Sequence, residues 1–307
     1  MQPRELGIQV CWERKSPISF YGKNPAAKPM GLLISRDASH GLTQARTFKI
    51  RYLLKLFVPD EVSSLEVKSK NVFVPYESMF KDKTILITGA ASGLGRAWAQ
   101  GFSADGATVI AADINGEGLV EVPAALRITL DVSRADDVER MIATTVKQTG
   151  RIDILFNNAG LGFNKRLENS ELGDFEQHIA VHLFAMVNAM RAAIPHMRRQ
   201  NFGRIINTIS RNAEYDTVGT SAYAAAKAGM WAASRVAAAE LSDTDILINM
   251  LIPGPTRTAI WGKDMAHFQE LSATYSTAKM LASFAKGGPS GKVFWNEAEY
   301  PMFQEGN

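Results

Sequence analysis

From residue 84 onward, short runs of β-branched and apolar residues alternate with longer stretches of helical periodicity. The short runs predict strands at 84–88, 107–112, 126–130, 152–156, 203–209 and 245–252, and a seventh strand within 291–301. The longer stretches predict helices at about 96–104, 135–149 and 171–199, and a further helix from Tyr223 to about Ser242. This alternation is typical of a parallel sheet that helices cover on both faces. The pattern therefore predicts a single doubly wound α/β domain over residues 79–307.

The first 78 residues do not share this alternation. Residues 17–46 are rich in Gly, Pro, Ser and Lys, a composition that favours loop or disorder. Residues 48–57 alternate apolar and basic side chains, which is compatible with a short strand or with a segment that binds a membrane surface. The segment 1–78 is thus an N-terminal extension, either a targeting segment or an upstream extension of the reading frame.

Composition and charge narrow the classes of partner. Hydrophobic residues make up 46% of the chain and charged residues 21%, as in an ordinary globular protein. Residues 1–78 hold twelve Lys/Arg against seven Asp/Glu, whereas residues 79–307 hold 22 against 24, so the basic balance belongs to the extension and predicts no nucleic-acid partner for the domain. No apolar run is long enough to span a membrane. The lone cysteine, Cys11, fits a reducing compartment, so we expect a cytoplasmic protein.

A glycine-rich turn follows the first predicted strand. It reads Gly89-Ala-Ala-Ser92-Gly93-Leu94-Gly95 and leads directly into a helix. Glycines there let the backbone turn sharply and approach a pyrophosphate, whose charge is met by amides at the helix N-terminus. The order of strand, glycine turn and helix therefore predicts a Rossmann-type site for a dinucleotide.

An acidic residue closes the second predicted strand. Asp113 lies eighteen residues after Gly95, where a carboxylate can accept hydrogen bonds from the ribose hydroxyls of the adenosine half. A carboxylate repels a 2′-phosphate, and Ile114 and Asn115 supply no cation to hold one. We therefore predict NAD(H) rather than NADP(H), the alternative being that Asp113 only caps the next turn.

Tyr223 and Lys227 are candidates for proton transfer. They are four residues apart in an alanine-rich stretch, so both side chains leave one face of the same helix. A nearby ammonium favours the phenolate, which predicts a Tyr223 pKa below its usual value of about 10. Ser210 lies thirteen residues upstream, at the end of a predicted strand, where its hydroxyl can reach the same cavity. On spacing alone, a Tyr and a Lys on a helix more often have no chemical role.

Taken together, these motifs resemble the short-chain dehydrogenase/reductase family. The resemblance rests on the spacing Thr88-Gly89-x-x-x-Gly93-x-Gly95, on Asn157-Asn158-Ala159-Gly160, and on Ser210 with Tyr223-x-x-x-Lys227. It implies that Ser210, Tyr223 and Lys227 are catalytic and that Lys227 also holds the nicotinamide ribose. It further implies cofactor contacts from the glycine turn and from a second set of residues: Asp131, Val132, Asn158, Ala159, Gly160, Pro253, Gly254, Thr256 and Thr258.

One position departs from the family. Its members usually carry Asn in the long helix, where it helps hold a water that links the lysine to solvent, but this chain has His182. An imidazole can hold the same water, although its usual pKa of about 6.5 adds a titration that Asn lacks. His178 lies one turn earlier, but no third ligand has suitable spacing for zinc, so we predict no metal site.

The predicted function is NAD(H)-dependent interconversion of a secondary alcohol and a carbonyl, with Tyr223 as general acid and base. The alternative is a relative that binds the cofactor without turnover, as a redox sensor or scaffold. The family resemblance also implies a homodimer or homotetramer. A segment of apolar residues falls where the family has its variable substrate lid, although the same side chains suit ordinary packing: Ile260, Trp261, Met265, Phe268, Leu271 and Tyr275.

Overall fold

A computed structural model of the chain describes residues 79–256 and 270–303, and the backbone of two short strands in the N-terminal segment. Those strands, β1 (Ser19–Phe20) and β2 (Met30–Gly31), pair antiparallel in a sheet of their own. The chain divides into two compact units, Met1–Asn71 and Val72–Asn307. The segment 48–57, for which we expected a strand or a surface-binding role, and the rest of the extension lie outside the described residues.

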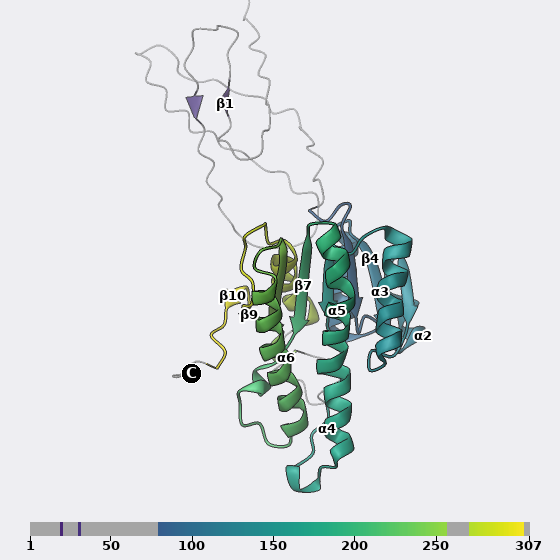
Figure 1. The fold of residues 1–307 in the computed structure, drawn as a ribbon, viewed down its shortest axis with the longest axis vertical. Helices are drawn as coiled ribbons and strands as arrows, with labels where there is room; N and C mark the ends of the chain where they lie inside the picture. The colour runs from purple at the N-terminus through teal and green to yellow at the C-terminus, as the bar shows by residue number, and fades with distance from the viewer. Residues whose placement is uncertain (1–18, 21–29, 32–78, 257–269, 304–307) are drawn as a thin grey trace, which may run out of the picture. The chain divides into compact units, whose positions relative to one another are not determined.

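The second unit is built on an eight-stranded sheet in the order β10-β9-β8-β7-β6-β3-β4-β5 (Figure 1). Seven strands pair in parallel, and only β10 runs antiparallel, against β9. The doubly wound parallel sheet predicted from the sequence is therefore confirmed. The strands are β3 (Thr84–Thr88), β4 (Thr108–Asp113), β5 (Leu126–Thr129), β6 (Ile154–Asn157), β7 (Gly203–Thr208), β8 (Ile246–Ile252), β9 (Val293–Trp295) and β10 (Ala298–Glu299).

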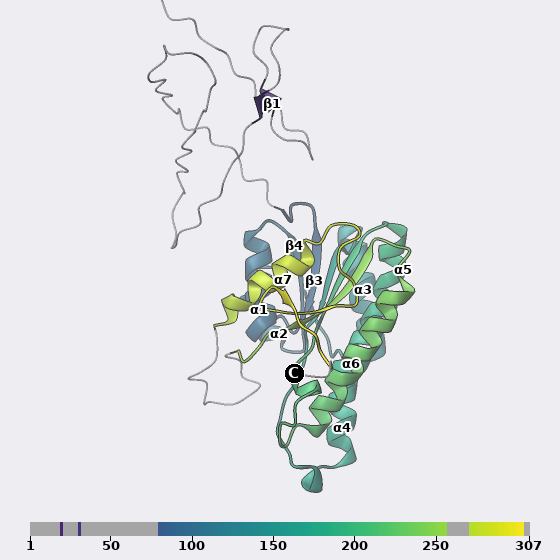
Figure 2. The same cartoon turned by 90° about the vertical axis from the view of Figure 1, so that its left-hand side faces the viewer.

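Helices cover both faces of the sheet because the side chains of each strand alternate between two apolar layers. Leu86 of β3 lies in the core with α3, α5 and α6, and the flanking Ile85 and Ile87 lie in the core with α1, α2 and α7. Figure 2 shows α3, α5 and α6 on one side of the sheet and α1 and α7 on the other. The helices are α1 (Gly93–Ala104), α2 (Gly116–Leu119), α3 (Ala135–Thr149), α5 (Ala185–Arg199), α6 (Ser221–Glu240) and α7 (Tyr275–Ala282).

The long helix predicted over 171–199 is present, but its winding changes. It begins as α4 (Leu172–His178), continues through a π-helical stretch, η2 (Ile179–Phe184), and ends as α5. A π-helical turn inside an α-helix is rare and often occurs at functional sites. His182 lies in this stretch.

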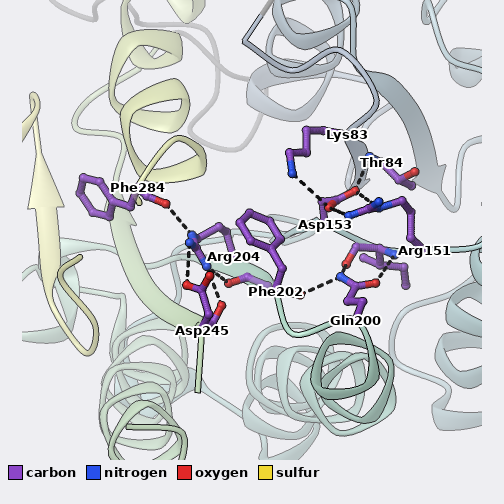
Figure 3. Close-up of polar contacts among 11 residues, drawn as sticks. Lys83, Thr84, Arg151, Asp153, Gln200, Phe202, Arg204, Asp245 and Phe284 are labelled. Carbon is purple, nitrogen blue, oxygen red and sulfur yellow. Dashed lines mark hydrogen bonds and ion pairs between the residues drawn. The ribbon is translucent and has the colours of Figure 1, made fainter. Parts of the chain in front are cut away.

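The amino ends of the strands carry a network of buried charges, shown in Figure 3. Arg204 of β7 is 1% exposed and bonds the Asp245 carboxylate at 2.9 Å and the Phe284 carbonyl at 2.8 Å. Asp153 is fully buried and accepts hydrogen bonds from the Thr84 amide at 2.9 Å and from Arg151 at 2.6 and 2.7 Å. Since buried charges need partners, these bonds fix the end of the sheet that lies opposite the dinucleotide motifs.

Part of the segment after β8 lies within the described residues. Tyr275, a candidate for a substrate lid, packs inside the domain: its ring lies 5.0 Å from that of Phe102, and its hydroxyl donates to Asp105 at 2.9 Å. Ordinary packing is thus the interpretation that the structure supports for Tyr275. Ile260, Trp261, Met265, Phe268 and the cofactor candidate Thr258 lie outside the described residues. Among the helices that the structure does describe, none combines the length and apolarity needed to cross a bilayer.

Candidate active site

The glycine turn after β3 has a geometry that only glycine can fill. Gly89 and Gly93 have φ angles of 69° and 51°, in the left-handed region that L side chains avoid. A Cβ on Gly95 would stand 2.2 Å from the Gly89 carbonyl oxygen, so no side chain fits there. The turn leads into the N-terminus of α1, whose N-cap is Ser92. This bare backbone beside a helix N-terminus fits a pyrophosphate group.

Asp113 lies at the end of β4 and ties the glycine turn to the next loop. Its Oδ2 accepts the Ala91 amide and its Oδ1 accepts the Asn115 amide, both at 2.9 Å. It therefore caps a turn, as the alternative interpretation required. Each carboxylate oxygen has a second lone pair, so capping leaves room to accept ribose hydroxyls as well.

Asp131 and Val132 follow β5 at the same edge of the sheet. The Asp131 Oδ1 accepts both the Ser133 amide at 2.9 Å and the Ser133 hydroxyl at 2.7 Å, which closes a local turn. Val132 lines a cavity of about 10 Å³ together with Thr88, Ala159 and His182. That volume is close to what one water molecule needs.

The Asn-Asn-Ala-Gly segment connects three strands. Asn157 donates to Asn207 of β7 at 2.8 Å, and Asn158 donates to the Thr88 carbonyl of β3 at 3.0 Å. The Thr88 hydroxyl in turn accepts the amides of Asn158 at 3.0 Å and Ala159 at 3.1 Å. These amides therefore tie β6 to its neighbours β3 and β7. Sequence reasoning had missed Thr88 and Asn207 as partners, because each bond spans fifty residues or more.

Ser210, Tyr223 and Lys227 lie together at the carboxyl edge of the sheet. Tyr223 and Lys227 are 8% and 4% exposed on the inner face of α6. The Lys227 Nζ donates to the Thr208 carbonyl at 2.7 Å and lies 5.5 Å from the centre of the Tyr223 ring. Ser210 lies two residues beyond the end of β7, and its side chain is hydrogen-bonded to that of Tyr223. The structure thus brings together the three side chains that the sequence motif selects.

The acid–base properties of this group differ from the expectation. Burial raises the pKa of Tyr223 to about 12, and the hydrogen bond with Ser210 offsets only part of that rise. Burial also lowers the pKa of Lys227 to about 7. The prediction that Lys227 brings the Tyr223 pKa below 10 is therefore wrong for this structure. Removal of both side chains from water changes their pKa values more than their proximity to each other does. The spacing of residues in the sequence does not reveal this burial.

His182 lies against the catalytic candidates. Its Nε2 is 2.8 Å from the Leu161 carbonyl, and its ring stands perpendicular to the Tyr223 ring at 5.3 Å. A Cβ on Gly160 would stand 2.6 Å from its Cε1. Burial, followed by the charge of Lys227, lowers the pKa of His182 well below its usual value. The imidazole is neutral near pH 7, so the titration expected near pH 6.5 is displaced to lower pH.

His178 is also buried, one turn before His182. Its Nδ1 lies 2.8 Å from the Asp174 carbonyl, and its ring lies 4.4 Å from that of Phe163. Within residues 79–256 and 270–303, no group of three or more His, Cys, Asp or Glu side chains is arranged to hold a metal ion.

The segment after β8 brings backbone and small side chains toward the site. Gly254 has a φ of 71°, and the Thr256 hydroxyl donates to the carbonyls of Pro253 at 3.1 Å and Gly254 at 3.0 Å. The hydroxyl of Thr256 therefore stabilises the turn itself. Cofactor contacts from Pro253, Gly254 and Thr256 remain predictions.

Comparison with known proteins shows which family shares this arrangement. Residues 83–268 match the short chain dehydrogenase family. An uncharacterized oxidoreductase of Mycobacterium bovis is 36% identical over 237 residues, which cover 70% of this chain and 96% of that protein. Levodione reductase of Leifsonia aquatica is 35% identical over 222 residues, covering 69% of this chain and 82% of the reductase.

Solved structures agree with the sequence relatives. The structure of 3-ketoacyl-(acyl-carrier-protein) reductase from Brucella melitensis complexed with NADH superposes with a TM-score of 0.66 at 26% identity, covering 70% of this chain and 96% of that one. The crystal structure of levodione reductase gives a TM-score of 0.64 at 28% identity, covering 70% and 95%. With its glycine turn, buried Tyr-x-x-x-Lys pair and matching relatives, the chain belongs to the short-chain dehydrogenase/reductase family of oxidoreductases, which bind NAD(P) nucleotides.

Proposed function

We propose that this protein is an NAD(H)-dependent oxidoreductase that interconverts a secondary alcohol and a carbonyl. The observation that carries the proposal is the meeting of the half-buried Ser210 with the buried Tyr223 and Lys227 at the carboxyl edge of the sheet. In open α/β sheets, that edge is where ligands bind. Two similar proteins, a levodione reductase and a 3-ketoacyl-(acyl-carrier-protein) reductase, are named for the reduction of ketones, which supports a carbonyl substrate.

Tyr223 is the proton donor in the reducing direction. With a pKa of about 12, its phenol is protonated across the neutral range and is ready to donate to the substrate oxygen. Ser210, bonded to the same phenol, hydrogen-bonds that oxygen while negative charge develops on it. The nicotinamide, when bound, supplies or accepts the hydride.

Lys227 supports the proton transfer by Tyr223. Near neutral pH its pKa of about 7 leaves a mixture of ammonium and amine, held at the Thr208 carbonyl. The ammonium form stabilises the Tyr223 phenolate that remains after proton donation, and it can hold the nicotinamide ribose. The His182 ring packs edge-on against the Tyr223 ring and lines a cavity with room for about one water, which supports a role for His182 in holding a water of this relay.

Asp113 supports NAD(H) as the cofactor. Its carboxylate is fixed by the Ala91 and Asn115 amides at the end of β4, and a 2′-phosphate placed there would meet that negative charge. The measurement is a pair of dissociation constants, for NADH and NADPH, by fluorescence titration. Equal or tighter binding of NADPH would exclude this assignment.

Substitution of Tyr223 tests the chemistry. Tyr223→Phe removes only the proton that is transferred, so we expect turnover to fall by a factor on the order of 10³ while the NADH dissociation constant changes less than about threefold. Tyr275→Phe is the matched control, since it removes a hydroxyl that bonds Asp105 away from the site. Substantial activity in Tyr223→Phe would refute the assignment. Cofactor binding without turnover by the wild type, across a panel of ketones and secondary alcohols, would favour the redox-sensing or scaffolding alternative.

The proposal also includes the assembly state and the location of the protein. We expect a homodimer or homotetramer in the cytoplasm, acting on a small carbonyl compound or alcohol, hydrophobic ones included. Sedimentation of the full chain measures the assembly directly, and a purely monomeric protein would contradict that part of the proposal.

A further inference from the structure

The backbone that carries Ser210 forms one compact turn. The Ser210 hydroxyl accepts the Asn212 amide at 3.2 Å and so caps the short 3-10 helix η3 (Arg211–Ala213). The Glu214 and Tyr215 amides then donate to the Arg211 carbonyl at 2.9 and 3.0 Å. The direction of the Ser210 hydroxyl therefore depends on the placement of residues 210–215 as a unit.

The far end of this turn is held by the C-terminal part of the chain. The two oxygens of the Glu214 carboxylate have different donors: Oε1 accepts the Tyr300 hydroxyl, and Oε2 accepts the Phe303 amide at 2.8 Å. Burial and the neighbouring carboxylate raise the pKa of Tyr300, so the phenol keeps its proton and remains a donor. Hydrogen bonds of this kind, with an ionised acceptor, are among the stronger ones in proteins.

The same segment also contacts the side chain next to Ser210. The Arg211 guanidinium lies 4.1 Å from the centre of the Trp295 ring and 5.1 Å from that of Tyr215. The Trp295 ring in turn packs edge-on against Tyr300 at 5.9 Å. Arg211 is thus held between aromatic rings, one of which belongs to β9.

A further contact reaches the helix of the catalytic tyrosine. The Phe303 ring lies 4.6 Å from that of Trp231, which is one helical turn beyond Lys227 on α6. Residues 293–303, which we call the C-terminal strap, therefore touch both the turn that carries Ser210 and the helix that carries Tyr223 and Lys227. Among the described residues after β8, no other segment makes a side-chain hydrogen bond to residues 210–215.

We propose that Glu214 and Tyr300 are positioning residues, through which the C-terminal strap sets the distance between the Ser210 hydroxyl and the Tyr223 phenol. This inference rests on the proposed function, because the distance matters only where both groups act on one substrate oxygen. Neither residue touches the reacting atoms. They act through Ser210: Glu214 belongs to the turn that carries Ser210, and Tyr300 and Phe303 bond Glu214 from 86 and 89 residues away along the chain.

The kinetic test is a double-mutant cycle in the full-length protein. We expect Tyr300→Phe to lower kcat by a factor on the order of 10, since misplacing a catalytic group by a fraction of an ångström costs about that much, and to leave the NADH dissociation constant unchanged. Glu214→Ala should match it, and Glu214→Gln, which keeps one acceptor oxygen, should fall between Glu214→Ala and the wild type. In a Ser210→Ala background the Tyr300→Phe effect on residual kcat should disappear.

Hydrogen exchange supplies a readout that does not depend on turnover. The amides of Asn212, Ala213, Glu214 and Tyr215 are all hydrogen-bonded within the turn, so Tyr300→Phe should speed their exchange several-fold. Exchange in β3 should stay as in the wild type. Tyr275→Phe, whose hydroxyl bonds Asp105, is the control in both experiments.

The outcomes separate the two proposals. Unchanged exchange at residues 210–215, or a kcat loss that persists in full in the Ser210→Ala background, overturns the positioning role. Faster exchange at the turn in a protein that turns over no alcohol or carbonyl leaves the strap contact established and refutes the proposed function instead.

Discussion

Arg204 offers the sharpest test of what holds the sheet together. Its guanidinium is 1% exposed and makes four hydrogen bonds: to the Phe284 carbonyl at 2.8 Å, to the Gly203 and Asp245 carbonyls at 2.7 Å each, and to the Asp245 carboxylate at 2.9 Å. The planar group also lies 4.2 Å from the centre of the Phe202 ring. Arg204→Met keeps the apolar stem and removes the charge and every donor.

The expected loss follows from what the substitution leaves behind. Three carbonyl oxygens and the Asp245 carboxylate, which is 15% exposed, each lose the hydrogen bond that Arg204 donates, although the Asp245 carbonyl keeps its bond from the Gly203 amide at 3.0 Å. Removing one member of a buried ion pair usually costs about 3–5 kcal/mol, and each stranded acceptor costs about 1–3 kcal/mol. We expect the free energy of unfolding to fall by about 3–5 kcal/mol, because part of the site can relax.

Arg166→Met is the matched control. Arg166 pairs with Glu168 at 3.0 Å, but the two side chains are 64% and 70% exposed, so water screens the pair and the expected loss is below about 0.5 kcal/mol. Both variants are compared with the wild type by urea denaturation at one protein concentration, followed by circular dichroism. Cofactor affinity should be unchanged in Arg204→Met, because the network lies at the opposite edge of the sheet. A loss below about 1 kcal/mol, or one equal to that of Arg166→Met, would refute this account of the buried network.

Two further predictions concern the site. Gly95→Ala places a Cβ 2.2 Å from the Gly89 carbonyl oxygen, so we expect NADH affinity to fall by at least about tenfold in a fluorescence titration, and undiminished affinity would contradict the close approach of the backbone there. Lys227→Met should abolish turnover and yet stabilise the cofactor-free protein by about 1–3 kcal/mol at pH 7.5. The folded pKa of Lys227, about 7, lies below the usual 10.5, so the unfolded state binds the extra proton between these values and wild-type stability rises with pH across that window. Denaturation at pH 7.5 and 10 checks this prediction, which fails if Lys227→Met is less stable than the wild type at pH 7.5.

The periodic elements could be predicted from the sequence because their signals are local. The helix at 135–149 begins and ends where the pattern placed it, and the parallel strands agree within one or two residues. The site motifs could be placed for the same reason, since Tyr223 and Lys227 share one helix face and Ser210 lies two residues beyond the end of a strand.

What the sequence concealed depends on burial and on long-range contacts. Arg204 is a charged residue within a predicted strand. No neighbouring residue in the chain indicates that Asp245 is the partner of its buried charge. The direction of the Tyr223 pKa was mispredicted because helical spacing indicates proximity to Lys227 and says nothing about access to water. The bond between Tyr300 and Glu214 spans 86 residues and carries no motif.

The π-helical stretch Ile179–Phe184 accommodates one residue more than a regular α-helix would over the same rotation, because its turns are wider. Deleting one residue from this stretch would let it rewind as regular α-helix, while Leu172–His178 would keep its angular position relative to α5. His178 would then stay beside the Tyr223 ring, which lies 6.1 Å from its own. Relatives that differ by a single deletion here would keep the sheet, the Tyr-x-x-x-Lys pair and the place of His178, and would differ in the wall of the site around His182.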